Sequence, residues 1–309
     1  MRAALIAVAL LALAACDSNQ MVGGVEAPAP HAIAPANLPA FFNCLREHHA
    51  TIVSAHRGGP GAGFAENAIP TFEHTLAATP AFMEVDVART RDGALVLMHD
   101  DTVDRTTSGH GAVRSLTEAQ FSALTLKDDD SAALDAHPPT LRQALDWADG
   151  RTVLELDVKP GVSYEELAEA VDQAHAMGRV IFVVYSVNAA SRLARVAPAA
   201  MINVSIRNAT DVDTLRSRGV DLSHIIAWTG TDEPDSALNV ALAQRGVEAS
   251  FGTIGSWDRS FARGEEQYAA FAESGLAMIA TNRPAEAVAD LDAHDGAQGY
   301  AALQCVSAR

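Results

Sequence analysis

Three short polar clusters within residues 56–100 carry side chains that could do chemistry together. Histidine titrates near neutral pH, so His56 and His99 could pass a proton in both directions. Glu84 and Asp86 are two residues apart on one expected strand, so their carboxylates share a face and suit a hard cation. Arg57 suits a planar or phosphate-like anion. The combination predicts metal-assisted acid–base chemistry on a phosphate ester.

A hairpin is expected to bring the second and third clusters together. Asp92-Gly93 lies between two apolar runs, and this dipeptide favours a two-residue hairpin loop. With that loop, His99 lies opposite Asp86. Residues opposite each other share a face, so Glu84, Asp86 and His99 are expected to converge on one spot.

The chain from about residue 50 to residue 290 resembles the glycerophosphodiester phosphodiesterase family. The matching pieces, in order, are His56-Arg57-Gly58, Glu66-Asn67 with Phe72, Glu84-Val85-Asp86-Val87, Arg91-Asp92-Gly93, His99-Asp100, Arg105-Thr106-Thr107-Ser108-Gly109, Pro139-Thr140-Leu141, Asp157-Val158-Lys159-Pro160 and Thr281-Asn282-Arg283-Pro284. The resemblance implies hydrolysis of glycerophosphodiesters to an alcohol and glycerol 3-phosphate. It also implies one divalent cation, Ca²⁺ or Mg²⁺.

Residue roles follow from the same resemblance. It makes His56 and His99 the general acid and base, in an order that the sequence leaves open. It makes Arg57 and Lys159 the groups that hold phosphate oxygens.

The cation in this family is held by the Glu and Asp of the second cluster, here Glu84 and Asp86, and by a carboxylate ahead of a lysine on a later strand. That strand usually reads Glu-x-Lys, whereas this chain reads Asp157-Val158-Lys159. Asp157 is therefore the expected third ligand. The residues expected to support these ligands, or to serve as alternative ligands, are Glu155, Glu66 and Asn67.

Strand-like and helix-like patterns alternate along the chain. Eight apolar runs read as strands: residues 51–55, 82–87, 152–158, 180–185, 201–206, 224–228, 247–251 and 277–280. Alternation favours parallel strands, and eight of them predict an α/β fold, the (β/α)₈ TIM barrel. Residues 94–98 are then the return arm of a β-hairpin after strand 2. A doubly wound sheet is the alternative from pattern alone.

Residues 102–138 form an expected small insertion in the barrel domain, which we place at residues 41–309. The run Asp128-Asp129-Asp130 lies within this insertion. Such a run could bind a second cation, although a solvated turn is the commoner outcome. Long loops of this kind on a barrel often serve function.

The start of the chain predicts export and a lipid anchor. Residues 1–15 read as a lipoprotein signal peptide, because Arg2 precedes an apolar run too short to span a bilayer. Leu13-Ala14-Ala15-Cys16 resembles the bacterial lipoprotein cleavage box, with Cys16 as the lipidated residue; a plain secretory signal is the alternative. Residues 16–40, rich in Ala, Pro and Gly, read as a flexible tether.

These features place the protein in the bacterial cell envelope, lipid-anchored to the membrane and facing the periplasm. Asp17 slightly favours the inner membrane. With Cys16 assigned to lipid, Cys44 and Cys305 remain as a pair in an oxidising compartment, and a closed barrel brings the two ends of the chain together. We expect them to form a disulfide; two unrelated thiols are the alternative.

The formal net charge is −17, which argues against nucleic acid as a partner. The expected partner is a small phosphodiester derived from phospholipids. Two other enzymatic functions would use the same site. One is hydrolysis of lysophospholipids, as by a lysophospholipase D, and the other is cleavage of inositol phosphodiesters. A non-catalytic surface-binding lipoprotein is the reading from another class. The sequence does not fix the oligomeric state.

Overall fold

The structure, a computed structural model, describes residues 31–265, 267–295 and 301–308. The expected signal peptide, Cys16 and most of the expected tether lie outside the described residues. Within the described part, no helix combines the length and the apolar character needed to cross a bilayer.

Eight parallel strands close into a barrel, as the alternating pattern predicts. Neighbours pair in the order β1-β9-β8-β7-β6-β5-β4-β2, and β1 also pairs with β2, which closes the ring. The strands are β1 Ile52–Ala55, β2 Phe82–Arg89, β4 Leu154–Val158, β5 Val180–Val184, β6 Met201–Ser205, β7 Ile225–Trp228, β8 Glu248–Gly252 and β9 Leu276–Thr281, with β3 Leu95–Leu97 antiparallel to β2. The fold is the TIM barrel, whose functional sites lie at the carboxyl ends of the strands.

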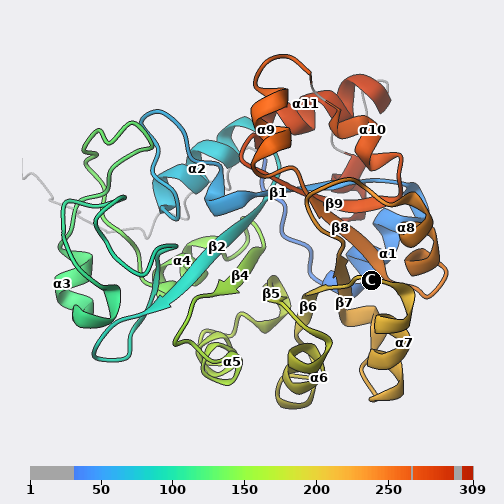
Figure 1. The fold of residues 1–309 in the computed structure, drawn as a ribbon, viewed down its shortest axis with the longest axis horizontal. Helices are drawn as coiled ribbons and strands as arrows, with labels where there is room; N and C mark the ends of the chain where they lie inside the picture. Colours follow the sequence, from blue (N-terminus) through green and yellow to red (C-terminus); the bar gives the residue numbers. More distant parts are fainter. Residues whose placement is uncertain (1–30, 266, 296–300, 309) are drawn as a thin grey trace, which may run out of the picture.

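Helices lie around the barrel, across one end of it and in the insertion (Figure 1). They are α1 Leu38–His48, α2 Ile69–Ala78, α3 Glu118–Ser122, α4 Leu141–Ala148, α5 Tyr164–Gln173, α6 Val187–Val196, α7 Ala209–Ser217, α8 Ser236–Ala243, α9 Ser256–Phe261, α10 Tyr268–Ala272 and α11 Pro284–Asp295. Short 3₁₀ turns are η1 His56–Gly58, η2 Val113–Ser115, η3 Met177–Arg179, η4 Leu222–His224 and η5 Ala301–Cys305. The main apolar core lies between the helices and the outer face of the strands.

The hairpin joins β2 to β3, but its loop has three residues, so the expected two-residue loop is wrong. Thr90 and Ala94 close the loop through a backbone hydrogen bond of 2.9 Å. The Thr90 hydroxyl also donates to Asp92 and accepts from the Ala94 amide, and Gly93 has a left-handed φ of 92°. A Gly in this conformation ends three-residue loops. The register therefore shifts by one residue, and the Met98 amide, not His99, meets the Asp86 carbonyl.

The segment after β3 forms a small body at one side of the barrel, drawn in green in Figure 1. It contains η2 and α3 and has a core of its own, built with the outer face of the hairpin. The core residues are Ala88, Val96, Met98, Val103, Val113 and Phe121. This core makes residues 102–138 an extension of the hairpin.

Helix α1 closes the amino-terminal end of the barrel. Asn37 caps the helix by accepting from the Ala40 amide, and Pro39 lies in the first turn, where its missing N–H costs nothing. Phe41 and Phe42 pack on the lowest inward-facing layer of the strands. That layer consists of Ile52, Phe82, Val153, Ile181, Met201, Ile226 and Met278. The floor of the barrel is therefore largely apolar, and its charged member is Glu248 of β8, which pairs in register with Ile226.

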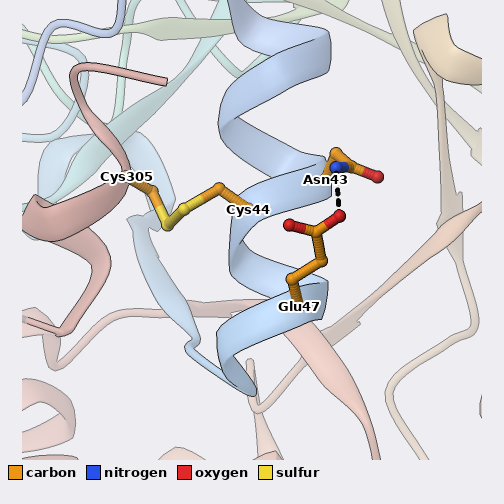
Figure 2. The surroundings of a disulfide bond; sticks show 4 residues. All are labelled: Asn43, Cys44, Glu47 and Cys305. Atoms are coloured by element: carbon orange, nitrogen blue, oxygen red, sulfur yellow. Dashed lines mark hydrogen bonds between the residues drawn. A yellow bond between two sulfur atoms is a disulfide. The ribbon is translucent and has the colours of Figure 1, made fainter. Parts of the chain in front are cut away.

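A disulfide and an ion pair also hold α1 to the barrel domain. Cys44 on α1 forms a disulfide with Cys305 of η5, with the Cα atoms 5.6 Å apart (Figure 2). This is the pair expected from the sequence. Arg46, also on α1, forms an ion pair with the buried Glu248 at the start of β8. The start and the end of the described chain thus lie together at the floor.

Candidate active site

The predicted site residues gather at the opposite end, where the strands finish. His56 and Arg57 follow β1 in η1, and Lys159 follows β4. Glu84 and Asp86 lie on β2 beside β4, where Asp86 pairs in register with Asp157. The pairing of parallel strands places these two aspartates at the same height in the barrel.

The turn after β1 has a backbone that few residues adopt. Arg57, Gly58 and Gly59 have φ values of 53°, 85° and 80°, all left-handed. A Cβ on Gly58 would lie 2.3 Å from the Phe72 ring. Strain of this kind persists where surrounding contacts enforce it. Here the turn aims the Arg57 amide at Glu84 Oε2, 2.9 Å away.

Three carboxylates form the centre of the site. Among the described residues, Glu84, Asp86 and Asp157 make the one group whose ligand atoms all lie within 4.8 Å of one another. Burial raises the pKa of Glu84 well above its usual range, and the neighbouring Asp86 and Asp157 raise it further. Like charges held together in this way suit a divalent cation with oxygen ligands, so the residues present fit Ca²⁺ or Mg²⁺.

Asp86 is the most enclosed of the three, with 1% of its surface exposed. Burial raises its pKa, but Lys159, Asn67 and Arg57 outweigh burial, and the pKa falls below the usual value. Asn67, whose φ of 57° is left-handed, donates to Asp86 Oδ2 at 2.7 Å and accepts from the Asp86 amide at 2.9 Å. Asn67 thus holds both the carboxylate and the backbone of Asp86.

Glu155 lies outside the acidic group, one inward-facing position below Asp157 on β4, and it is buried. The Asn203 amide donates to Glu155 at 3.2 Å, and Ser250 donates to Asn203 at 2.9 Å. Burial raises the pKa of Glu155, which favours the neutral acid. The structure places Asp157, rather than Glu155, with the other two carboxylates.

The two expected phosphate-binding cations lie against carboxylates. Lys159 Nζ is 2.6 Å from Asp86 Oδ1 and 2.7 Å from Asp157 Oδ2. Arg57 contacts Glu66 at 2.9 Å and Asp86 at 3.5 Å. Both groups therefore add positive charge beside the acidic cluster, where an anionic substrate would need it.

The two histidines have different partners. His56 Nδ1 is 2.8 Å from Asn282 Oδ1, which turns Nε2 toward Glu84 Oε2, 4.0 Å away. Burial lowers the pKa of His56 below the usual value. His99 Nδ1 is 2.8 Å from Asp100 Oδ1 instead. One imidazole is therefore oriented by an amide and the other by a carboxylate.

A chain of ion pairs connects His99 to the acidic cluster. Arg105 binds Asp100 through Nε at 2.7 Å and Glu66 through Nη2 at 2.8 Å. Glu66 in turn binds Arg57, which reaches Asp86. The hydrogen bond from Arg105 holds the pKa of Asp100 far below its usual range, so Asp100 stays charged.

Sequence reasoning missed four residues of this site: Asn282, Asp100, Arg105 and Tyr185. The first three lie within matching pieces of the family resemblance, and that could have marked them. Tyr185 directly follows β5, and its hydroxyl donates to Asp157 Oδ1 at 2.7 Å. Its position at a strand end was the available signal.

The aspartate run of the insertion has a structural role at its first residue. Asp128 accepts from the amide of Gly63 at 2.8 Å and from the amides of Asp130 and Ala132. These bonds close a turn and fasten it to the glycine-rich loop after β1. Asp128 is buried in this turn, whereas Asp129 and Asp130 are exposed.

The fold and the site define a TIM-barrel protein with an acidic, histidine-flanked centre at the strand ends. The model of the glycerophosphoryl diester phosphodiesterase family matches residues 56–210, and the chain belongs to that family.

Similar proteins agree with this assignment. A glycerophosphodiester phosphodiesterase of Caldanaerobacter subterraneus is 32% identical over 139 residues, which cover 42% of this chain and 56% of that protein. The uncharacterized protein YqiK of Bacillus subtilis is 32% identical over 155 residues, or 48% of this chain and 63% of YqiK. The chain therefore spans about three fifths of the length of these relatives. A Parabacteroides distasonis glycerophosphoryl diester phosphodiesterase structure is 29% identical, with a TM-score of 0.75, covering 84% of this chain and 94% of that one.

Proposed function

We propose that this protein is a metal-dependent phosphodiesterase that hydrolyses glycerophosphodiesters to an alcohol and glycerol 3-phosphate. The observation that carries the proposal is the three-carboxylate group, with His56 Nε2 4.0 Å from Glu84. His99 is connected to this group through Asp100 and the ion pairs of Arg105. Family membership supports it. A structural relative from Oleispira antarctica, 19% identical, was solved with the product sn-glycerol-3-phosphate.

The acidic and the basic residues of the site have different proposed roles. Glu84, Asp86 and Asp157 would hold Ca²⁺ or Mg²⁺, and such an ion would supply Lewis-acid stabilisation of the charge that develops on the phosphate. Arg57 and Lys159 would share their positive charge between their carboxylate partners and the phosphate oxygens.

We assign His56 as the base and His99 as the acid. Burial lowers the pKa of His56 and so favours its neutral form, and its Nε2 is free of the Asn282 bond. Nε2 can therefore accept a proton from the attacking hydroxyl as that oxygen bonds to phosphorus. As the bond from phosphorus to the alcohol oxygen breaks, His99 gives that oxygen a proton. The Asp100 carboxylate orients His99 for this step.

Two sources of the attacking hydroxyl fit this assignment. Water gives glycerol 3-phosphate directly. The neighbouring hydroxyl of the glycerol gives a cyclic phosphate, which water then opens with the two histidines in exchanged roles. The sequence offers no nucleophile motif, so we do not propose a covalent phosphoenzyme.

A glycerophosphodiester with p-nitrophenol as the alcohol separates the two histidines, because nitrophenolate leaves without a proton. On glycerophosphoethanolamine, His56→Ala and His99→Ala should each lower kcat by ~10²–10⁴-fold. On the nitrophenyl ester, His56→Ala should keep its full effect and His99→Ala should lose most of its effect. The opposite pattern would exchange the roles, and near-normal kcat in both variants would refute acid–base catalysis by this pair.

The alcohol and the cation are open to a direct assay. Glycerophosphocholine, glycerophosphoethanolamine, glycerophosphoinositol and lysophosphatidylcholine, each tested with Ca²⁺ and with Mg²⁺, cover the proposed substrate and both enzymatic alternatives. Turnover of lysophosphatidylcholine alone would indicate a lysophospholipase D, and turnover of glycerophosphoinositol alone an inositol-specific enzyme. Absence of hydrolysis with every substrate would favour the non-catalytic surface-binding lipoprotein.

We also propose that Cys16 carries a lipid anchor that holds the domain at the periplasmic face of the envelope, with the inner membrane slightly favoured by Asp17. The sequence of residues 1–17 supports this proposal. Labelled palmitate should enter the wild-type protein in a bacterial host and fail to enter Cys16→Ser.

A further inference from the structure

Tyr185 contacts the proposed cation site from a strand that supplies none of its three carboxylates. It follows β5, the neighbour of β4, and its hydroxyl donates to Asp157 Oδ1 at 2.7 Å. The other oxygen, Asp157 Oδ2, accepts from Lys159 at 2.7 Å. Asp157 therefore has one donor on each oxygen, one neutral and one charged.

The other two carboxylates also each have an uncharged donor. Glu84 accepts from the backbone amide of Arg57 at 2.9 Å, and Asp86 accepts from the side-chain amide of Asn67 at 2.7 Å. Each carboxylate of the cluster thus receives one hydrogen bond from an uncharged donor outside its own strand. An uncharged donor fixes the direction of a carboxylate without adding a positive charge that would oppose a cation.

Packing does not explain why residue 185 is aromatic. Its exposed fraction of 62% is the largest among the exposed large hydrophobic side chains of the described residues. Ring burial therefore contributes little here, while the phenol is placed on a ligand oxygen. A phenol keeps its proton at neutral pH, and a carboxylate can only accept, so the Tyr185 hydroxyl is the donor in this hydrogen bond.

We propose that Tyr185 is a positioning residue, whose hydroxyl holds the Asp157 carboxylate in the orientation that completes the cation site. This inference rests on the metal dependence of the proposed function. It concerns binding of the cation, so it can be measured without substrate.

The test is the affinity for Ca²⁺, and separately for Mg²⁺, measured by calorimetry on protein freed of metal. Tyr185→Phe keeps the exposed ring and removes only the hydroxyl, and should weaken binding about 10- to 100-fold, the usual effect of losing a residue that orients a ligand. Tyr268→Phe is the matched control, because its hydroxyl lies 3.1 Å from the Thr281 hydroxyl of β9, a strand that carries none of the three carboxylates. The control should bind the cation like the wild type.

A double-mutant cycle separates positioning from an independent effect. If Tyr185 acts through Asp157, then Tyr185→Phe should cost little further affinity in an Asp157→Asn background. Excess cation should also restore kcat in Tyr185→Phe while KM for the diester stays unchanged. Unchanged cation affinity in Tyr185→Phe, an equal loss in Tyr268→Phe, or full additivity in the cycle would overturn the proposal. Weakened cation binding in a protein that hydrolyses no diester would sustain it while refuting the proposed function.

Discussion

Asp157 and Glu155 lie two residues apart on β4, yet their surroundings differ. Asp157 joins the acidic group, whereas Glu155 hydrogen bonds to Asn203 in the layer below. Asp157→Asn should therefore lower kcat/KM by at least ~10²-fold at limiting cation, since it removes a charged ligand. Glu155→Gln should have a much smaller effect, because burial already favours the neutral acid. Kinetics at several cation concentrations check this order, and the reverse order would reassign the third ligand.

Asp100 offers a second test on a single side chain. Asp100→Asn removes the charge that faces His99 Nδ1 and should lower kcat about 10- to 100-fold, part of what acid–base catalysis supplies. The loss should shrink on the nitrophenyl ester, since protonation of the alcohol no longer matters. Asp104→Asn is a matched control, because Asp104 pairs with the exposed His110 at 3.2 Å in the same segment. Equal losses in both variants would point to general damage to the segment.

The turn η1 is the element that most directly sets the geometry of the site. Gly58→Ala brings a Cβ to 2.3 Å from the Phe72 ring at a left-handed φ, and should lower the free energy of unfolding by about 3 kcal/mol. Gly61→Ala in the following loop is the control, since its Cβ would meet nothing within 4 Å. Denaturant unfolding of both variants decides the matter, and a Gly58→Ala protein as stable as Gly61→Ala would refute this account of the turn.

Elements were predictable where periodicity alone decides them. The eight barrel strands and the return arm of the hairpin follow from apolar runs and alternation. The loop length did not follow from the sequence. The hydrogen bonds of the Thr90 hydroxyl with Asp92 and with the Ala94 amide stabilise a loop of three residues, whereas Asp-Gly predicts two.

The site was predictable as far as residue type and strand position decide it. The acidic triad depends on the order of residues along β2 and β4, which the sequence displays. The Asp157–Tyr185 bond depends on which strands become neighbours and how far a phenol reaches, and only the closed barrel settles that. The ion-pair path through Arg105 likewise needs the fold of the insertion.

At the scale of the whole molecule, the stability of the protein depends on pH through Glu248, which is buried at the floor of the barrel. Burial raises the pKa of Glu248 to about 7, even though Arg46 lies against it. The folded-state pKa is above the unfolded one, near 4.3. The protonated form therefore favours the native state, and that stability is fully present below about pH 4 and lost as the pH rises to about 7.

Glu248→Gln should remove this part of the pH dependence. Relative to Glu248→Gln, the wild type should lose on the order of 3 kcal/mol of unfolding free energy between about pH 4 and pH 7. Glu165→Gln, which breaks an exposed pair with Arg192, should follow the wild type. Denaturant unfolding at several pH values with chelator present measures the difference, and parallel curves for Glu248→Gln and wild type would refute the assignment.

The Cys44–Cys305 bond also has a mechanical consequence. Residues 44–305 form one covalent ring that contains every strand of the barrel. Tension applied to the two outer ends of the chain therefore passes through the sulfur atoms, and the seam between β1 and β9 is shielded from it. Single-molecule pulling should extend only the outer segments until the disulfide is reduced. Reduction should then release a contour length of about 900 Å, set by a sequence separation of 261 residues.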